Sequence, residues 1–322
     1  MTPLQFEQLY DKDWVELELC LERHAAAPSA RSISGARFTA LYRQTCGHLA
    51  IARSRAYPAH LVDRLEHLTA QCHQLIYQQR EFGIGWLARI IAHDFPVAVR
   101  AHGGYVLTAT LLFLVPTFVM GALVYAQPEL ILSVVSAEKA SEFDEMYSSS
   151  AASIGRLRSV DTDWMMFGHY IRNNVGVAFQ CFAGGLFGGL GSIFFLAFNG
   201  AFGGAIAGYL TGRGLGSTFY SFIVTHAAFE LTAIVLAGAA GLRIGHSLLA
   251  PGRQTRVQSL IGASRQSVVL LYGVFAMLVV AAVIEAFWSS ATWLPVTVKY
   301  GVAALCWIAV LAYFTLQGRR AR

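Results

Sequence analysis

Apolar and polar positions are divided unevenly along this chain of 322 residues. Up to about residue 100, leucines and aromatic residues recur at helical spacings among many charged residues, as at Leu17 and Leu21. Such spacing is typical of amphipathic helices. It predicts three of them, at about 3–27, 34–55 and 58–80. Three helices of this kind form a small bundle.

Beyond residue 100 the charged positions become sparse and long apolar runs take over. A helix needs about twenty apolar residues to cross a bilayer. Five runs reach that length, at about 104–126, 175–198, 217–241, 267–288 and 296–316. A sixth piece, 200–212, is shorter and is either a short helix or a re-entrant segment. The segment 83–100, with Trp86 and Phe95, is predicted to lie along the membrane interface or to add a fourth helix to the bundle.

Composition supports the same division. The chain is 55% hydrophobic and 13% charged, whereas soluble domains carry about 25% charged residues. We therefore expect an all-α protein: a polytopic membrane helix bundle with a small N-terminal cytosolic helical bundle. The first domain is placed at 1–100, including the interfacial helix, and the transmembrane domain at 101–322.

The distribution of charge predicts how the chain is oriented. The segment 242–266 holds four arginines and no acid, and the C-terminal tail ends with Arg319, Arg320 and Arg322. The loop 127–172 instead carries seven acids against four basic residues. Because basic loops stay on the cytoplasmic side, both termini are expected in the cytoplasm, with the acidic loop on the outer side of the membrane. An odd number of crossings is then needed before Arg243, so either the 200–212 piece crosses as well, which gives six spans, or one of the longer runs fails to cross. Six spans are favoured.

The net charge of +5 does not indicate a nucleic-acid partner, because no recognition-helix, RNP or zinc-finger pattern occurs. Five cysteines without a CxxC pair indicate reduced thiols. No cofactor is predicted. His226-x-x-x-Glu230 differs from the His-Glu-x-x-His metal motif and has no evident third ligand, so no metal site is predicted. No Gly-x-Ser-x-Gly nucleophile motif occurs, and we expect no enzymatic activity.

Glycines recur every fourth residue in the membrane half. On a helix this spacing forms a stripe without side chains, along which a neighbouring backbone can approach closely. The predicted helix-packing glycines are Gly184, Gly188, Gly200, Gly204, Gly208, Gly212, Gly241 and Gly245. The Asn199-Gly200 step between two of the runs is read as a tight turn or as a broken helix lining a transport site.

Polar residues at membrane depth are costly unless they are paired or wetted, so they mark functional sites or buried polar locks. His226 and Glu230 lie four residues apart and share one helix face. Asn199 and Glu285 complete the predicted intramembrane polar site, and Asn173 and Asn174 mark the entry from the outer loop into the membrane. Three roles remain open for this site: a structural lock between helices, a proton or cation pathway, and recognition of a partner helix or a lipid headgroup.

The chain also resembles the stage II sporulation protein M family of bacterial membrane proteins. The N-terminal part of the resemblance is carried by Tyr42-Arg43, Leu49-Ala50, Ala52-Arg53 and Ile76-Tyr77. The middle part is carried by Pro128-Glu129-Leu130, Glu145-Met146-Tyr147, Asn173-Asn174, Ala178-Phe179 and Asn199-Gly200. The C-terminal part is carried by His226, Glu230-Leu231, Ala233-Ile234, Ala237-Gly238, Gly241-Leu242, Pro251-Gly252-Arg253, Ile284-Glu285 and Phe287. One departure is Gly47-His48, where the family pattern has an acidic residue.

The resemblance implies a role in an envelope complex, because the sporulation member looks like a membrane anchor for cell-wall hydrolases. Relatives with a cytosolic N-terminal bundle are often encoded near AAA-type ATPases. We therefore expect a scaffold or assembly component whose partners are membrane lipids and other membrane or envelope proteins, with homo-oligomerisation left open. The alternative is a transporter or channel that uses Glu230 and His226.

Overall fold

The computed structural model describes residues 1–26, 35–77, 84–148, 160–291 and 293–319, and Arg320 and Arg322 lie outside these ranges. Every regular element in the described ranges is helical, which confirms the all-α fold. Contacts divide the chain into two compact units, Met1–Phe82 and Gly83–Arg322. Each unit is described by itself.

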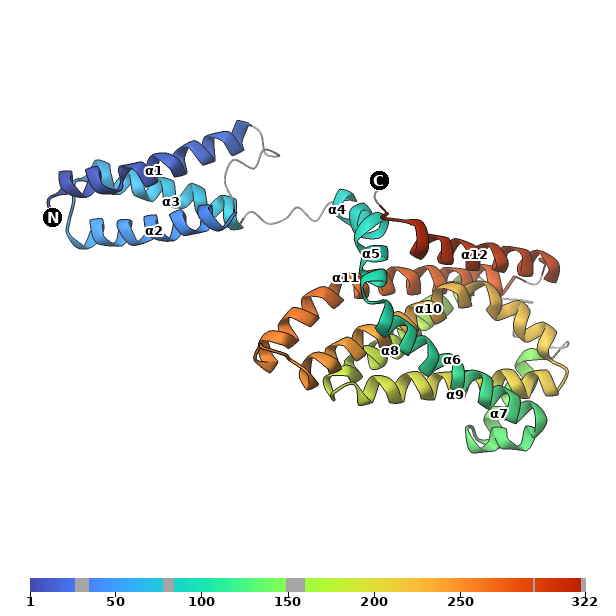
Figure 1. The fold of residues 1–322 in the computed structure, drawn as a ribbon. Helices are drawn as coiled ribbons and strands as arrows, with labels where there is room; N and C mark the ends of the chain where they lie inside the picture. Colours follow the sequence, from blue (N-terminus) through green and yellow to red (C-terminus); the bar gives the residue numbers. More distant parts are fainter. Residues whose placement is uncertain (27–34, 78–83, 149–159, 292, 320–322) are drawn as a thin grey trace. The chain divides into compact units, whose positions relative to one another are not determined.

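The N-terminal unit is the predicted three-helix bundle, formed by α1 (Pro3–Ala26), α2 (Gly35–Ser54) and α3 (Ala59–Tyr77) (Figure 1). Its apolar positions come together in one core that lies wholly within the unit. Its fully buried side chains include Trp14, Leu17, Leu41, Leu61 and Leu65. Burial of a large apolar side chain stabilises a fold by about 1.5–3 kcal/mol, so this core accounts for a separate folding unit.

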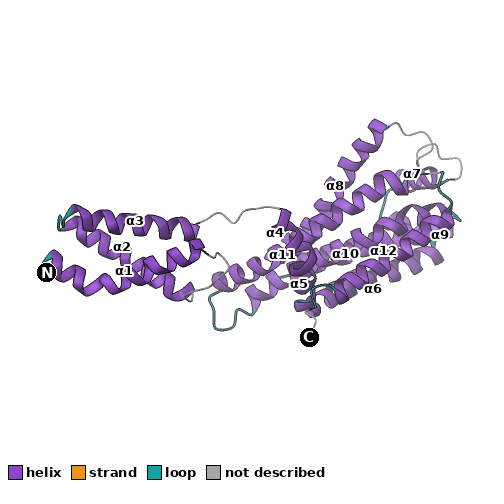
Figure 2. Ribbon diagram, turned by 90° about the horizontal axis from the view of Figure 1, so that it is seen from above, coloured by secondary structure: helices purple, strands orange, loops and turns teal. Residues whose placement is uncertain are grey.

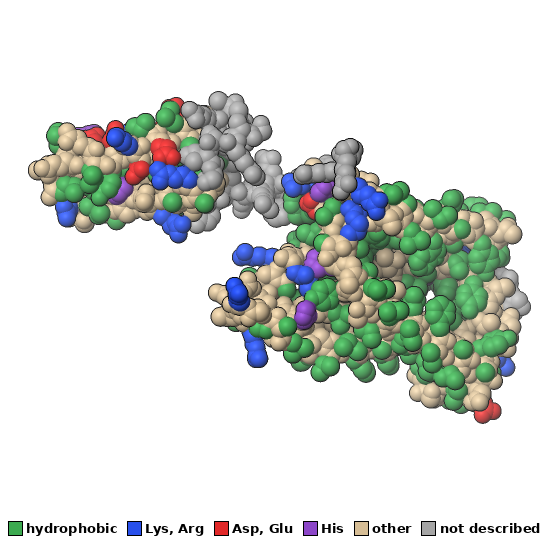
Figure 3. Space-filling model, in the orientation of Figure 1, with side chains coloured by type: hydrophobic (Ala, Val, Ile, Leu, Met, Phe, Trp, Pro, Cys, Tyr) green, Lys and Arg blue, Asp and Glu red, His purple; other side chains and the backbone are tan. Residues whose placement is uncertain are grey.

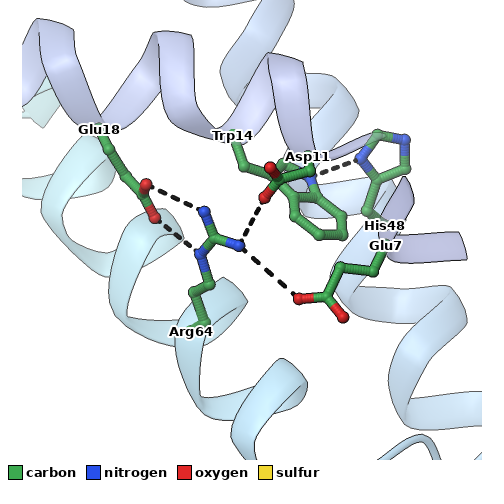
Figure 4. A network of polar contacts seen from close by, with 6 residues as sticks. All are labelled: Glu7, Asp11, Trp14, Glu18, His48 and Arg64. Atoms are coloured by element: carbon green, nitrogen blue, oxygen red, sulfur yellow. Dashed lines mark hydrogen bonds and ion pairs between the residues drawn. The ribbon is translucent and has the colours of Figure 1, made fainter. Parts of the chain in front are cut away.

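A polar network ties α1 to α3 beside that core (Figure 4). The Arg64 guanidinium binds Glu18 at 2.9 Å and Asp11 at 2.7 Å, and its carbon lies 5.6 Å from the centre of the Trp14 ring. Hydrogen bonds to Glu18 and Asp11 raise the pKa of Arg64 above its ordinary value, although partial burial works in the opposite direction. The Trp14 indole N–H donates to Nδ1 of the buried His48 at 3.1 Å. His48 is therefore part of the bundle core.

The second unit, Gly83–Arg322, is the membrane unit. It begins with a helical segment made of α4 (Ile84–Arg89), the π-turn η1 (Ile90–Asp94) and α5 (Phe95–Ala101). The sequence predicts this segment as part of a domain 1–100, but its contacts place it in the membrane unit. Its Phe95 ring packs directly on Gly273, and the Arg100 guanidinium donates to the carbonyl of Phe314 at 2.8 Å. The segment therefore packs along two of the long helices that follow.

The long helices of the membrane unit pack around one central member (Figures 1 and 2). They are α6 (Gly103–Ala126), α8 (Val160–Ala183), α9 (Leu190–Gly212), α10 (Gly216–Leu249), α11 (Arg256–Val283), which continues into the π-turn η4 (Ile284–Ser289), and α12 (Val296–Leu316). Helix α10 contacts α6, α8, α9, α11 and α12. In the most apolar stretch of α10, 61% of the residues are buried, whereas the corresponding shares are 11% in α6 and 17% in α12. Helix α10 therefore forms the centre of the bundle.

The helices break at a different place from the one expected. The break was expected between the runs 175–198 and 200–212. It lies instead inside the first run, at the 3₁₀ turn η3 (Gly184–Leu186) and the residues after it, where Gly188 and Gly189 adopt φ angles of +64° and +87°. Gly184 and Gly188 therefore do not form a stripe on a helix. The Asn199-Gly200 step is neither a turn nor a break, since it lies inside the continuous helix α9.

Five helices among the described residues are long and apolar enough to cross a membrane: α6, α9, α10, α11 with η4, and α12. Large apolar side chains cover the outside of these helices, with Phe118 71% and Leu305 66% exposed. Figure 3 shows this apolar surface across one face of the membrane unit, with basic side chains at one of its ends. A surface of this kind is expected where lipid is the solvent. The protein is an integral membrane protein.

A short helical cap closes the end of the unit where α9 meets α10. It consists of η2 (Pro128–Ser133) and α7 (Ala137–Tyr147), and the Ser136 hydroxyl accepts from the backbone N–H of Lys139 at the start of α7. Asp144 accepts a hydrogen bond from the Tyr209 hydroxyl at 2.9 Å and pairs with Arg213 at 3.3 Å. These contacts anchor the acidic segment 128–147 to the end of α9.

Candidate functional site: a buried histidine and glutamate cluster

The central helix α10 carries the first two polar residues of the site. His226 is 5% exposed, and its Nε2 lies 3.9 Å from a carboxylate oxygen of Glu230, one helical turn further on. The sequence spacing predicted that these side chains share a face and lie within reach of one another. His226 is buried inside the helix bundle, whereas the Glu230 side chain is 19% exposed.

Glu285 joins them from the π-turn η4 at the end of α11. One ligand atom each of His226, Glu230 and Glu285 lie within 4.8 Å of one another, and Glu285 is 9% exposed. A π-turn widens a helix locally and is frequent at functional sites. One imidazole and two carboxylates from two elements therefore meet at one point, and these residues could hold a metal ion.

Further polar groups surround this cluster. His226 Nδ1 shares a hydrogen bond of 3.0 Å with the hydroxyl of Ser289, and the Lys299 ammonium donates to the Ser289 carbonyl at 2.8 Å. Ser289 is 1% and Lys299 6% exposed. Sequence reasoning missed both residues. The available signal was the position of Ser289, four residues after Glu285 and on the same face.

Asn174 completes the cluster from a third helix, because its side-chain amide lies beside the Glu230 carboxylate. It is 3% exposed and accepts from the Asn173 amide at 3.1 Å. Both asparagines were expected where the outer loop enters the membrane. They lie well inside α8, which begins at Val160.

Asn199 has a different role from the one expected. Its amide donates to the Phe195 carbonyl at 2.7 Å, one turn earlier in the same helix. This bond gives the Asn199 amide N–H a partner within α9, and the helix is continuous through this position. The structure therefore brings His226, Glu230, Glu285 and Asn174 together and places Asn199 as a polar residue of α9.

Glycines hold α9 against α6 at backbone contact. A Cβ atom on Gly204 would lie 2.1 Å from the Thr117 carbonyl oxygen. A Cβ atom on Gly200 or on Gly208 would lie 2.2 Å from another carbonyl oxygen of α6. Gly212, the last of the series, has no neighbouring atom closer than 3.5 Å to such a Cβ. Close Cα–H···O contacts of this kind are a recurrent feature of helix pairs packed through small residues.

A second glycine contact joins the turn before α9 to the central helix. A Cβ on Gly185 would lie 2.1 Å from the Gly241 carbonyl oxygen, and one on Gly245 would lie 2.2 Å from the backbone nitrogen of Gly189. A Cβ on Gly184 would lie 2.5 Å from the backbone of Gly191 in the first turn of α9. Any side chain at these positions would push the helices apart, so the turn, α9 and α10 form one tightly packed frame.

The comparisons with known proteins agree with this division of the chain. Residues 109–290, more than half of the chain, match the family described as stage II sporulation protein M, and residues 4–78 match a domain of unknown function (DUF8413). Neither a curated protein nor a solved structure matches the chain. The first matched segment contains the glycine contacts and the cluster at His226, Glu230 and Glu285. The chain therefore belongs to the stage II sporulation protein M family.

Proposed function

We propose that the protein is a scaffold or assembly component of a membrane or cell-envelope complex. The observation that carries this proposal is the backbone contact of α6, α9 and α10 through glycines. At Gly204 and Gly185 the helices approach so closely that sliding one past another would bring side chains into carbonyl groups. Cores packed in this way do not deform continuously, which suits a frame that holds its two ends in a fixed arrangement.

The proposed frame crosses the inner membrane of a bacterial cell six times, with α8 as the crossing that is too polar to stand out by hydropathy. The packing of α8 supports this crossing, because its Asn174 is buried and α8 contacts α10 and α11. With α8 counted, the arginine-rich segments 242–266 and 317–322 and the N-terminal bundle all fall on one side. By the positive-inside rule that side is the cytoplasm.

Two surfaces would serve for docking, one on each side of the membrane. The bundle of α1–α3 has its own core and is a separate unit, so its outer faces are available to a cytoplasmic partner. The acidic segment 128–147 is anchored to the frame through Asp144 and would meet an envelope partner outside. A rigid frame between two docking surfaces is a coherent design for assembly.

Affinity purification in mild detergent tests this proposal. The full chain and a variant lacking residues 1–77 are purified in parallel from the native host, and the co-purifying proteins are identified. The proposal expects a reproducible partner set, part of which disappears with the bundle while the membrane unit remains folded. Purification of both proteins as isolated homomers would refute the scaffold role.

A second function is favoured by one specific observation, the buried cluster of His226, Glu230 and Glu285. In a transporter or channel, such a cluster would bind and release a proton or a cation. The substitution Glu230→Gln separates the two functions. A transporter loses flux and keeps its partners, whereas a scaffold shows altered assembly and moves no substrate.

A further inference from the structure

We propose that His226, Glu230 and Glu285 form a binding site for one divalent transition-metal ion of the Zn²⁺ or Mn²⁺ class. The site would fasten the central helix α10 to the π-turn η4 within the membrane. This inference goes beyond the scaffold role and does not depend on it, because a bound metal would stabilise the helix bundle whatever its partners.

The first argument is geometric. Zinc binds histidine nitrogen and carboxylate oxygen at about 2.0–2.2 Å, which places neighbouring ligand atoms about 3.4 Å apart in a tetrahedral site. His226 Nε2 and Glu230 Oε2 lie 3.9 Å apart, and the chosen atoms of all three residues lie within 4.8 Å of one another. The His226–Glu230 pair would have to close by about 0.5 Å and the widest pair by at most about 1.4 Å, which is within the reach of the long glutamate side chains.

The second argument is the orientation of the imidazole. A metal-binding histidine almost always donates its other ring N–H to an oxygen, which fixes the tautomer and aims the free nitrogen at the metal. His226 has this arrangement: Nδ1 lies 3.0 Å from the buried Ser289 hydroxyl while Nε2 faces Glu230. With the proton on Nδ1, the lone pair of Nε2 is directed toward the carboxylates.

The third argument concerns charge. Two ionised carboxylates this close together, one buried and one 19% exposed, repel each other unless a cation lies between them. The Lys299 ammonium donates to the Ser289 carbonyl and supplies one positive charge, whereas two ionised glutamates carry two negative charges. A divalent ion that binds both glutamates offsets their repulsion directly.

The chemistry of the ligands selects the class of metal. Imidazole nitrogen is a good ligand for zinc and other transition metals, whereas Ca²⁺ and Mg²⁺ prefer sites made only of oxygen. Binding displaces protons from any protonated glutamate, so the affinity rises with pH.

Metal analysis of the purified protein tests the site. The full chain, carrying a tag without histidine, is stripped with a chelator in mild detergent, reloaded with Zn²⁺, Mn²⁺ or Ca²⁺, and analysed by mass spectrometry of the metals. The proposal expects one Zn²⁺ or Mn²⁺ per chain and no bound Ca²⁺. Co²⁺ loading of the same protein should give visible absorption bands of a nitrogen and oxygen site, a readout that needs no variant.

Matched variants locate the ion. Glu285→Gln and His226→Asn should abolish stoichiometric binding, and Ser289→Ala should weaken it by about 10–100-fold because only the outer partner is lost. His169→Asn and Glu145→Gln, which replace exposed residues of the same types, should bind like the unaltered chain. The proposal is overturned if the unaltered chain binds no transition metal, or if Ser289→Ala and Glu285→Gln both retain full occupancy.

Discussion

Replacing Gly204 by alanine inserts one methyl group where α9 touches α6. The new Cβ would lie 2.1 Å from the Thr117 carbonyl oxygen, 0.9 Å closer than the 3.0 Å below which real Cβ contacts essentially do not occur. The atom it meets belongs to the backbone of a helix and cannot rotate away. The two helices must therefore separate by about 1 Å, which also loosens the contacts at Gly200 and Gly208.

The cost follows from overpacking and lost contacts. Extra methyl groups in a close-packed interior cost about 1–3 kcal/mol, and a gap of about 1 Å forfeits up to half of the dispersion energy along the interface. Alanine also favours the helix over glycine by about 1 kcal/mol. Gly203→Ala is the matched control, because its Cβ meets nothing within 4 Å and it gains the same helix propensity.

The comparison isolates the steric term. Unfolding of both variants in mixed micelles, followed by circular dichroism as the fraction of denaturing detergent rises, should show Gly204→Ala less stable than Gly203→Ala by about 1–3 kcal/mol. Equal stability of the two variants, or a more stable Gly204→Ala, would refute the backbone contact between α6 and α9.

Two further predictions concern the N-terminal bundle, measured on residues 1–82 by urea denaturation. Arg64→Met should reduce the free energy of unfolding by about 1–3 kcal/mol, because it leaves hydrogen-bonded carboxylates without their partner. The control Arg53→Met breaks one exposed ion pair and should change the free energy of unfolding by less than about 0.5 kcal/mol. Equal losses in the two variants would contradict the network. Burial lowers the pKa of His48 below its ordinary 6.5, so below that pH the unfolded chain takes up the proton more readily and the bundle loses stability as the pH falls. The loss should be visible between pH 7.5 and 5.5 and smaller in His48→Gln, and a parallel pH dependence of the two proteins would exclude His48 as its source.

The sequence predicted the elements whose signals are local. The three helices of the bundle follow from apolar spacing, and the pairing of His226 with Glu230 follows from the helical repeat. The backbone approach at Gly204 likewise follows from glycines spaced four apart.

The break between helices could not be predicted in the same way. Asn199-Gly200 and Gly188-Gly189 are both turn signals, and tertiary packing decides between them. Gly189 lies against the backbone of Gly245, whereas Asn199 hydrogen-bonds within its own helix. Ser289 and Lys299 were missed for a related reason, since Ser289 meets His226 only where separate helices come together, and Lys299 reaches the carbonyl of Ser289 from α12.

The central claim is that the protein is a static frame and not a conducting pathway. Ion flux into proteoliposomes tests this claim most directly. Vesicles containing the full chain, with indicators inside for H⁺, Na⁺, K⁺, Zn²⁺ and Mn²⁺, are compared with protein-free vesicles and with vesicles containing Glu230→Gln. The account predicts the same rates in all three. A flux that needs the protein and disappears in a folded Glu230→Gln variant would contradict it.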